Sequence, residues 1–172
     1  ENTNRAARMA TGQWLVFLDH DDVLSPDALF EVAQRSVARP EAGFIYSDEA
    51  LFENDILTPT VGHFKPDDSP QYLLNVNYIA HLAAVKRDIF FKVGGFHSEY
   101  DGAQDHDLFL RVLEETGGAE HIRRVLYYWR QHEQSTSTGL DAKPYAAEAA
   151  KKAIGGHLDR ENLRGTVVDG MY

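Results

Sequence analysis

Short apolar runs alternate with amphipathic segments along this chain, and the alternation predicts an α/β layered fold. The run Trp14–Leu18 has the length of a strand, contains no polar residue, and ends abruptly in acidic residues. An unbroken run of this kind is typical of a strand that is covered on both faces. Further strands are expected at 43–47, 81–85, 121–129 and 166–168, and helices at 2–11, 70–74, 86–93, 105–115 and 143–158.

A further helix is predicted to begin at Ser25 and Pro26, because serine is a good N-cap and proline fits the first helical turn. Pro40 ends this helix. Residues 54–70 are rich in proline, glycine and aspartate, which is typical of a loop. In the helix that is predicted to begin at Ser25, the residues expected to face the core are Leu29, Val32, Ala33 and Ser36.

Composition narrows the classes of function. The chain has 172 residues and a net charge of −10, because 27 acidic residues outnumber 17 lysines and arginines. This balance opposes binding to a polyphosphate backbone, so general nucleic-acid binding is not expected. The chain has no cysteine, which excludes disulfides, a thiolate nucleophile and cysteine-ligated zinc. No apolar run approaches the ~18 residues of a membrane span, and the length suits a single domain.

Three aspartates, Asp19, Asp21 and Asp22, directly follow the first apolar run. Like charges this close repel one another unless a cation or solvent relieves them, so a divalent metal is the economical explanation. Acidic residues at the C-terminal end of a strand also lie where α/β folds place their ligand sites. The alternative is a capping role, and Asp22 fits a cap of the following turn.

Two more polar groups occur downstream. Residues 104–107 (QDHD) precede an amphipathic helix, where the helix dipole favours acidic residues without any further function. Residues 129–135 follow a strand and contain His132, which could ligate a metal as neutral imidazole. Position alone leaves a functional and a purely structural role open for both groups.

Taken together, these groups resemble those of the family 2 glycosyltransferases with a GT-A fold. The resemblance runs from residue 1 to about residue 158 and is strongest for bacterial O-antigen and other surface-polysaccharide transferases. It implies a GT-A fold, which is Rossmann-like, of the nucleotide-diphospho-sugar transferase type, with a mixed sheet flanked by helices. The resemblance rests on NRAA at 4–7, Gly12, FLDHDD at 17–22, GGF at 94–96, QDHDL at 104–108 and WRQH at 129–132. The likeness to the surface-polysaccharide transferases adds YSDE at 46–49, FKPD at 64–67 and NYIAH at 77–81.

The resemblance also implies roles for individual residues. The segment from Asp19 to Asp21 matches the family's DxD motif, which binds a divalent cation and the nucleotide diphosphate. Asp21 is then the main metal ligand, with Asp19 toward the metal or the ribose and Asp22 in support. Asp105 matches the catalytic base, although Gln104 stands where many members have glutamate. Three further residues are implied near the metal or the diphosphate: His132 as a metal ligand, and Arg130 and Ser135 beside the diphosphate.

The implied reaction is an inverting sugar transfer from a nucleotide-sugar donor to a glycan or lipid-linked acceptor. A metal neutralises charge on the leaving diphosphate, and Asp105 takes the proton of the acceptor hydroxyl as it attacks the anomeric carbon from the opposite face. Aspartate and histidine ligands favour Mn²⁺ or Mg²⁺. Because sugar nucleotides are needed, the expected location is the cytoplasm, with the inner face of the plasma membrane as a further option.

GT-A enzymes begin with strands and helices that hold the nucleotide base, whereas this sequence begins just before the DxD-like strand. We therefore expect residues 1–172 to be a single truncated glycosyltransferase domain, with the DxD motif and the acceptor side, to which relatives often add a second module. Two alternatives stay open. Residues 17–23 also fit the hhDxDxV pattern of haloacid-dehalogenase-like, Mg-dependent phosphatases. A non-catalytic carbohydrate-binding module is the other alternative, with Tyr78, Tyr100, Tyr127, Tyr128 and Trp129 as candidates for stacking on sugar rings.

Overall fold

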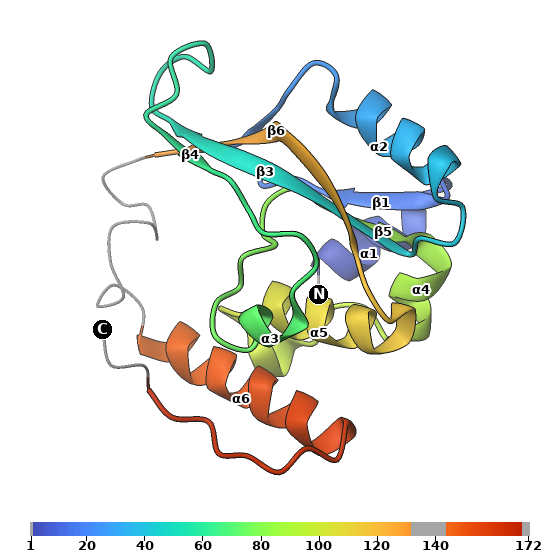
Figure 1. The fold of residues 1–172 in the computed structure, drawn as a ribbon, viewed down its shortest axis with the longest axis vertical. Helices are drawn as coiled ribbons and strands as arrows, with labels where there is room; N and C mark the ends of the chain where they lie inside the picture. Colours follow the sequence, from blue (N-terminus) through green and yellow to red (C-terminus); the bar gives the residue numbers. More distant parts are fainter. Residues whose placement is uncertain (1, 132–143, 170–172) are drawn as a thin grey trace.

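The centre of the fold is a mixed β-sheet (Figure 1). The computed structural model describes residues 2–131 and 144–169. The strands of the described residues are β1 (Trp14–Phe17), β2 (Val23–Leu24), β3 (Phe44–Phe52), β4 (Val61–His63), β5 (Ala83–Lys86) and β6 (Glu120–Arg130). They follow the order β1-β5-β3-β6-β2, and β4 pairs with β3 outside this path. β3 and β6 run parallel, and the other pairings of the described strands are antiparallel.

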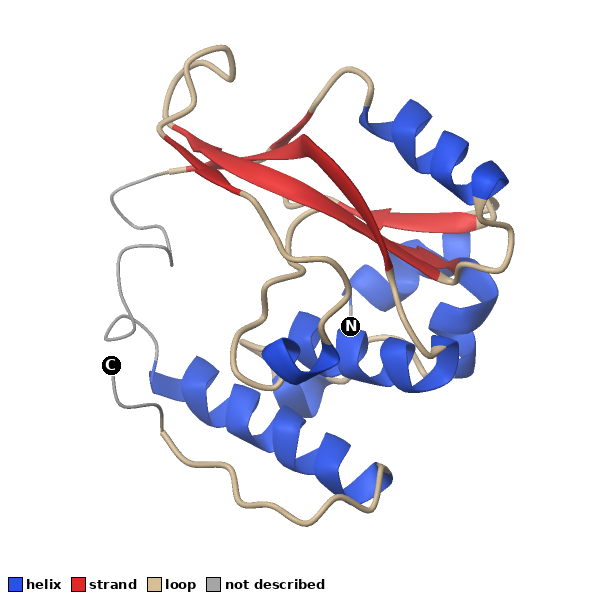
Figure 2. Cartoon of the chain, viewed as in Figure 1, coloured by secondary structure: helices blue, strands red, loops and turns tan. Residues whose placement is uncertain are grey.

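Helices cover both faces of this sheet. They are α1 (Asn2–Met9), α2 (Ala28–Ala38), α3 (Pro70–Leu73), α4 (Arg87–Lys92), α5 (Gln104–Thr116) and α6 (Pro144–Arg160), with a short 3₁₀ helix at Ser98–Tyr100. One face carries α2, whereas α1, α3, α4 and α5 gather on the other (Figure 2). α6 packs against α5 on the side away from the sheet (Figure 1). Among the described helices we find none with the length and apolar character that a bilayer crossing requires.

Alternation of side chains along the strands divides the core into two layers. Phe44 and Tyr46 of β3 belong to the apolar cluster that contains Leu108 of α5. Ile45, which lies between them in the strand, belongs to the cluster that contains Val32 of α2. Successive residues of a strand point to opposite faces, so Phe44 and Tyr46 pack toward α5 while Ile45 packs toward α2. β3 thus contributes side chains to both core layers.

Two polar contacts join segments that are far apart in the sequence. The side chain of Asn4 donates to the backbone carbonyl of Phe96 (2.7 Å) and accepts from the N–H of the same residue (2.9 Å). Arg111 of α5 pairs with the fully buried Asp107 one turn earlier (2.5 Å) and donates to the carbonyl of Gly95 (2.8 Å). These contacts hold the loop between α4 and α5 against α1, and so fix the position at which α5 begins.

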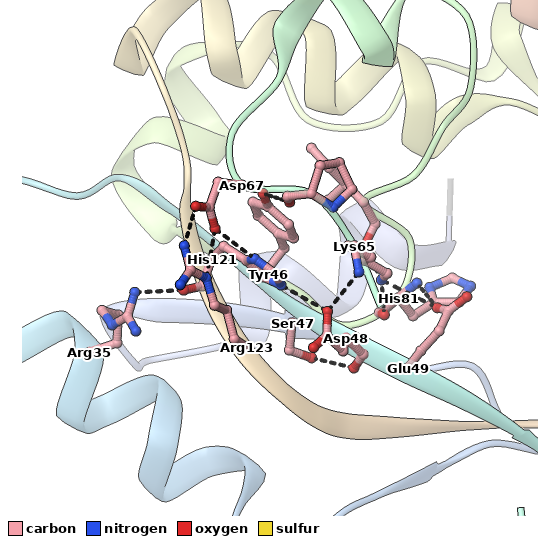
Figure 3. A network of polar contacts seen from close by, with 12 residues as sticks. Arg35, Tyr46, Ser47, Asp48, Glu49, Lys65, Asp67, His81, His121 and Arg123 are labelled. Carbon is pink, nitrogen blue, oxygen red and sulfur yellow. Dashed lines mark hydrogen bonds and ion pairs between the residues drawn. The ribbon is translucent and has the colours of Figure 1, made fainter. Parts of the chain in front are cut away.

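A buried polar network holds the segment after β4 against β3 (Figure 3). The side chains of Glu49 and Lys65 are each 4% exposed, and their carboxylate and ammonium groups lie 3.4 Å apart. Lys65 also donates to the carbonyls of Ile79 (2.9 Å) and His81. The backbone N–H of His81 donates to the carboxylate of Glu49. One buried ion pair therefore holds the backbone of His81 from both sides.

Asp48 anchors the other half of this network. Its carboxylate accepts from the backbone N–H of Lys65 (2.9 Å) and lies 2.9 Å from Nε2 of His121 on β6. The other ring nitrogen of His121 lies 3.2 Å from Asp67, and the ring stacks on Tyr46 with 4.7 Å between centroids. Each of the two adjacent carboxylates of β3 thus has a cationic or hydrogen-bonding partner, as burial of a charge requires.

The predicted α/β class with a mixed sheet flanked by helices is confirmed, and several details differ. Leu29 (61% exposed) and Ala33 are both exposed, so their predicted core positions are wrong, because α2 turns Ala28 and Val32 toward the sheet. This helix begins at Ala28 and not at the predicted Ser25 and Pro26. Residues 166–168 form no strand, since no neighbouring strand pairs with them. β4 lies within the predicted loop, where pairing with β3 imposes extended structure. β2 was not predicted either, and it forms by pairing with β6.

The packing predicts that replacing leucine by alanine has unequal effects on stability at a buried and at an exposed position. Leu108→Ala removes a fully buried side chain from α5 and should lower the free energy of unfolding by about 2–5 kcal/mol. Leu29→Ala, at an exposed position of α2, should change it by less than about 0.5 kcal/mol. Urea unfolding followed by circular dichroism measures both values, and similar losses for the two variants would contradict the observed packing.

The buried ammonium group predicts a rise in stability between about pH 8 and pH 10. Burial lowers the pKa of Lys65 from 10.5 to about 8, so the unfolded chain holds this proton more tightly than the folded chain does. Raising the pH through this window removes the cost of the buried charge, with a slope of up to roughly 1.4 kcal/mol per pH unit. Above pH 10 the trend should reverse, because burial raises the pKa of the phenols of Tyr46 and Tyr127.

Urea unfolding of the natural protein and of Lys65→Met across this window tests the assignment. The variant loses the titrating group, so its stability should lack the rise, even though its overall stability falls because Glu49 loses its partner. Equal slopes in the two proteins would assign the pH dependence to another group.

Candidate functional site

The loop after β1, the start of α5 and the end of β6 open onto one cleft with a volume of about 2000 Å³. β1 and α1 form a further part of its wall. The predicted site residues Asp19, Asp21 and Asp105 all line this cleft, together with His81 and Trp129. The fold therefore brings together two acidic groups that are far apart in the sequence.

The first acidic group is a turn that directly follows β1. The backbone N–H of Asp22 donates to the carbonyl of Asp19 (3.3 Å) and closes the turn. The side chain of Asp19 is 66% exposed, and that of Asp21 is 34% exposed. The ring of His20 lies 3.6 Å from the carboxylate of Asp21. An apolar edge strand that ends in this turn thus delivers carboxylates to the cleft.

Asp22 and Arg130, which were both expected to bind the donor, make extensive contacts within the protein. The carboxylate of Asp22 accepts from the hydroxyl of Tyr127 (2.5 Å) and from the backbone N–H of Arg130 (2.8 Å). Burial raises the pKa of Asp22, and the two hydrogen bonds oppose that shift. The guanidinium of Arg130 donates to the carbonyl of Asp21 (2.9 Å) and lies 4.4 Å from the centre of the Phe52 ring. Arg130 still lines the cleft, whereas Asp22 lies behind the turn.

The second acidic group begins α5. The carboxylate of Asp105 accepts from the side-chain amide of Asn77 (3.0 Å) and from the N–H of His106 (2.8 Å). A negative charge is favourable here, because the first turn of a helix presents unpaired N–H groups. Gln104, which stands where many relatives of the family have glutamate, accepts from the N–H of Gly102 and caps the preceding loop (2.8 Å). Two donors thus orient a carboxylate that borders the cleft, which suits a general base.

His81 is a cleft residue to which the sequence analysis gave no role. Its ring stacks on Tyr127 (4.7 Å between centroids) and meets the edge of Trp129 (5.8 Å). Nε2 of His81 lies 4.0 Å from the carboxylate of Asp19. In the sequence, the NYIAH stretch at 77–81 is the feature that points to His81, and it also contains the asparagine that contacts Asp105.

Asp19 and Asp21 are the described residues that fit a divalent cation. Mg²⁺ and similar ions are commonly held by one or two carboxylates together with the phosphates of a substrate, and two carboxylates from one turn suit this mode. The described part of the chain contains no group of three or more His, Cys, Asp or Glu side chains that could hold an ion by itself. The predicted ligand His132 and the predicted diphosphate contact Ser135 lie outside the described residues.

Comparison with known sequences identifies a family. The profile of glycosyl transferase family 2 matches residues 1–97, which is more than half of the chain. Protein y4gI of Sinorhizobium fredii, which is uncharacterized, is 41% identical over 92% of this chain. The O-antigen biosynthesis protein RfbC of Myxococcus xanthus is 37% identical over 92% of this chain. The chain spans 18% of the first relative and 12% of the second.

Solved structures share the fold at low sequence identity. S. aureus TarS 1–349 in complex with UDP matches with a TM-score of 0.64 at 12% identity, over 90% of this chain and 43% of that chain. The mannosyltransferase PcManGT from Pyrobaculum calidifontis, in complex with GDP-Man and Mn²⁺, matches with a TM-score of 0.52 at 18% identity, over 95% of this chain and 54% of that chain. These likenesses confirm the predicted GT-A fold, of which the chain covers part. The matched profile shows that the chain belongs to glycosyl transferase family 2.

Proposed function

We propose that this chain is the metal-binding and acceptor-side part of an inverting, metal-dependent glycosyltransferase. It would move a sugar from a nucleotide-sugar donor to a glycan or lipid-linked acceptor in cell-surface polysaccharide synthesis. The observation that carries the proposal is that the acidic turn and Asp105 border the same cleft. The O-antigen name of RfbC and the nucleotides bound in the two solved structures support this class of reaction.

The acidic turn is the proposed site for the donor diphosphate. Asp21 would be the main ligand of a Mn²⁺ or Mg²⁺ ion, with Asp19 beside it and the diphosphate oxygens completing the shell. A cation bound there neutralises the charge that grows on the diphosphate as it leaves. Asp22 supports the turn from behind through Tyr127 and the N–H of Arg130. Arg130 lines the cleft, where it contacts the backbone of Asp21 and keeps its predicted place beside the diphosphate. His132 keeps its predicted place as a further ligand.

Asp105 is the proposed general base. An alcohol is a weak nucleophile until its proton is removed, so a carboxylate within hydrogen-bond reach accelerates its attack. The acceptor oxygen bonds to the anomeric carbon while the bond from that carbon to the diphosphate breaks on the opposite side, and the proton goes to Asp105. A single displacement of this kind inverts the configuration of the sugar. The amide of Asn77 and the backbone N–H of His106 each donate to one carboxylate oxygen of Asp105, and together they fix the orientation of this group at the border of the cleft.

Membership of glycosyl transferase family 2 argues against the phosphatase alternative, which rested chiefly on the pattern at residues 17–23. The carbohydrate-binding alternative makes a different prediction, because a non-catalytic module would bind glycan without nucleotide or metal.

Since the chain spans only part of its relatives, the activity is proposed for the full-length protein. The need for sugar nucleotides places the proposed reaction in the cytoplasm.

Asp105→Asn should separate chemistry from donor binding. The amide cannot accept the proton, so transfer by the full-length protein should fall by at least about 100-fold. Binding of nucleoside diphosphate with Mn²⁺ should stay within about twofold, because the diphosphate site is left intact. Asp101→Asn, at an exposed position that does not line the cleft, is the matched control. Undiminished turnover in Asp105→Asn would remove Asp105 from the role of base.

Asp21→Ala should weaken nucleotide binding only when the metal is present. We expect at least about a tenfold loss of affinity for a nucleoside diphosphate in Mn²⁺, because a charged ligand of the cation is removed. In EDTA the variant and the natural protein should bind the nucleotide equally weakly. Isothermal titration calorimetry with UDP and GDP measures both conditions, and an unchanged Mn²⁺-dependent affinity would exclude Asp21 as a metal ligand.

A further inference from the structure

Tyr127 lies directly behind the acidic turn, where its hydroxyl contacts Asp19 and Asp22. Its side chain is fully buried in β6. The hydroxyl donates to the carboxylate of Asp22 (2.5 Å) and accepts from the backbone N–H of Asp19 (3.2 Å). One phenolic oxygen therefore contacts both the first and the last residue of the turn.

The position of this hydroxyl is tightly constrained. Tyr127 pairs with Leu24 of β2, the short strand that directly follows the acidic turn. This pairing fixes the backbone of Tyr127 next to the turn. Its ring stacks on the ring of His81, whose own backbone is held by the buried pair of Glu49 and Lys65 (Figure 3). A side chain that is fully buried and stacked on a fixed ring has little freedom to shift.

Tyr127 contacts the turn from outside the cleft, unlike the acidic residues that line it. The carboxylates of Asp19 and Asp21 line the cleft, whereas Tyr127 does not. Asp22 receives a second hydrogen bond from the N–H of Arg130, which lies farther along β6. The turn is therefore held from the side of β6, while its other carboxylates project toward the ligand space. Functional groups that bind ions are effective only when supporting residues hold them within a fraction of an ångström.

We propose that Tyr127 is a positioning residue for the acidic turn, which it holds in the geometry that binds a divalent cation and a nucleoside diphosphate. This proposal rests on the proposed function of the turn. Asp22 acts with Tyr127 as the acceptor of its hydrogen bond, and neither side chain needs to touch the ligand. Loss of the hydroxyl should loosen the turn and weaken metal-dependent nucleotide binding without removing a ligand.

Tyr127→Phe in the full-length protein tests the proposal, because phenylalanine keeps the ring and removes the hydroxyl alone. We expect the affinity for UDP or GDP with Mn²⁺ to fall about tenfold, as the loss of a hydrogen bond to a charged group implies. Affinity in EDTA should not change. Tyr128→Phe, the same substitution at the adjacent residue of β6, is the matched control and should bind as the natural protein does, since Tyr128 does not line the cleft.

Asp22→Asn provides a second route to the same answer if Tyr127→Phe does not fold. Its amide is uncharged and accepts the Tyr127 and Arg130 hydrogen bonds less well, so it should also weaken Mn²⁺-dependent binding. In the double variant the two losses should not add, because both remove the same contact. Fully additive losses, or unchanged Mn²⁺-dependent affinity in either single variant that folds, would overturn the role of Tyr127. A natural protein that binds no nucleoside diphosphate with Mn²⁺ would overturn the proposed function itself, and this inference with it.

Discussion

The parallel pairing of β3 with β6 is the constraint on which the rest of the structure depends. It runs from the pair Ile45 and Glu120 to the pair Phe52 and Arg130, with register shifts around Asp48. This pairing carries the end of β6 to the turn that follows β1. It also places His121 beside the buried carboxylate of Asp48. If the two strands were to separate, the acidic turn would lose its support and the network beneath the cleft would lose one wall.

Two small groups of acidic residues have different physical roles. Asp48, Glu49 and Asp107 are buried, and each is paired with a basic side chain on the protein itself. Asp19 and Asp105 lie at the cleft, with at least part of each side chain facing solvent. Burying an unpaired charge is costly, so the carboxylates of the first group are tied to the fold, whereas those of the second group border open space.

Much of the fold could be predicted from the sequence, because its strongest signals are local. The apolar run of β1 and the amphipathic pattern of α5 identify both elements and the acidic residues at their ends. β4 could not be predicted, since its extended shape comes from pairing with β3 and not from its own residues. The exposed position of Leu29 likewise depends on which face of α2 meets the sheet.

The candidate site was predicted in part for the same reason. The resemblance to a family singled out Asp19, Asp21 and Asp105, and the fold brings them to one cleft. The contacts of Asp22 with Tyr127 and Arg130 join residues more than 100 positions apart, so no local pattern predicts them. The placement of His81 depends on a buried ion pair that forms only in the folded chain.

We propose that the acidic turn and Asp105 serve one reaction centre. A crystal structure of the full-length protein with Mn²⁺ and a nucleoside diphosphate tests it most directly, with the metal located by its anomalous scattering. The account predicts an anomalous peak beside the carboxylates of Asp19 and Asp21, with the diphosphate on it and Asp105 facing the same cleft. A peak at another place on the molecule, or an Asp105 side chain separated from the bound nucleotide by the body of the protein, would contradict the account.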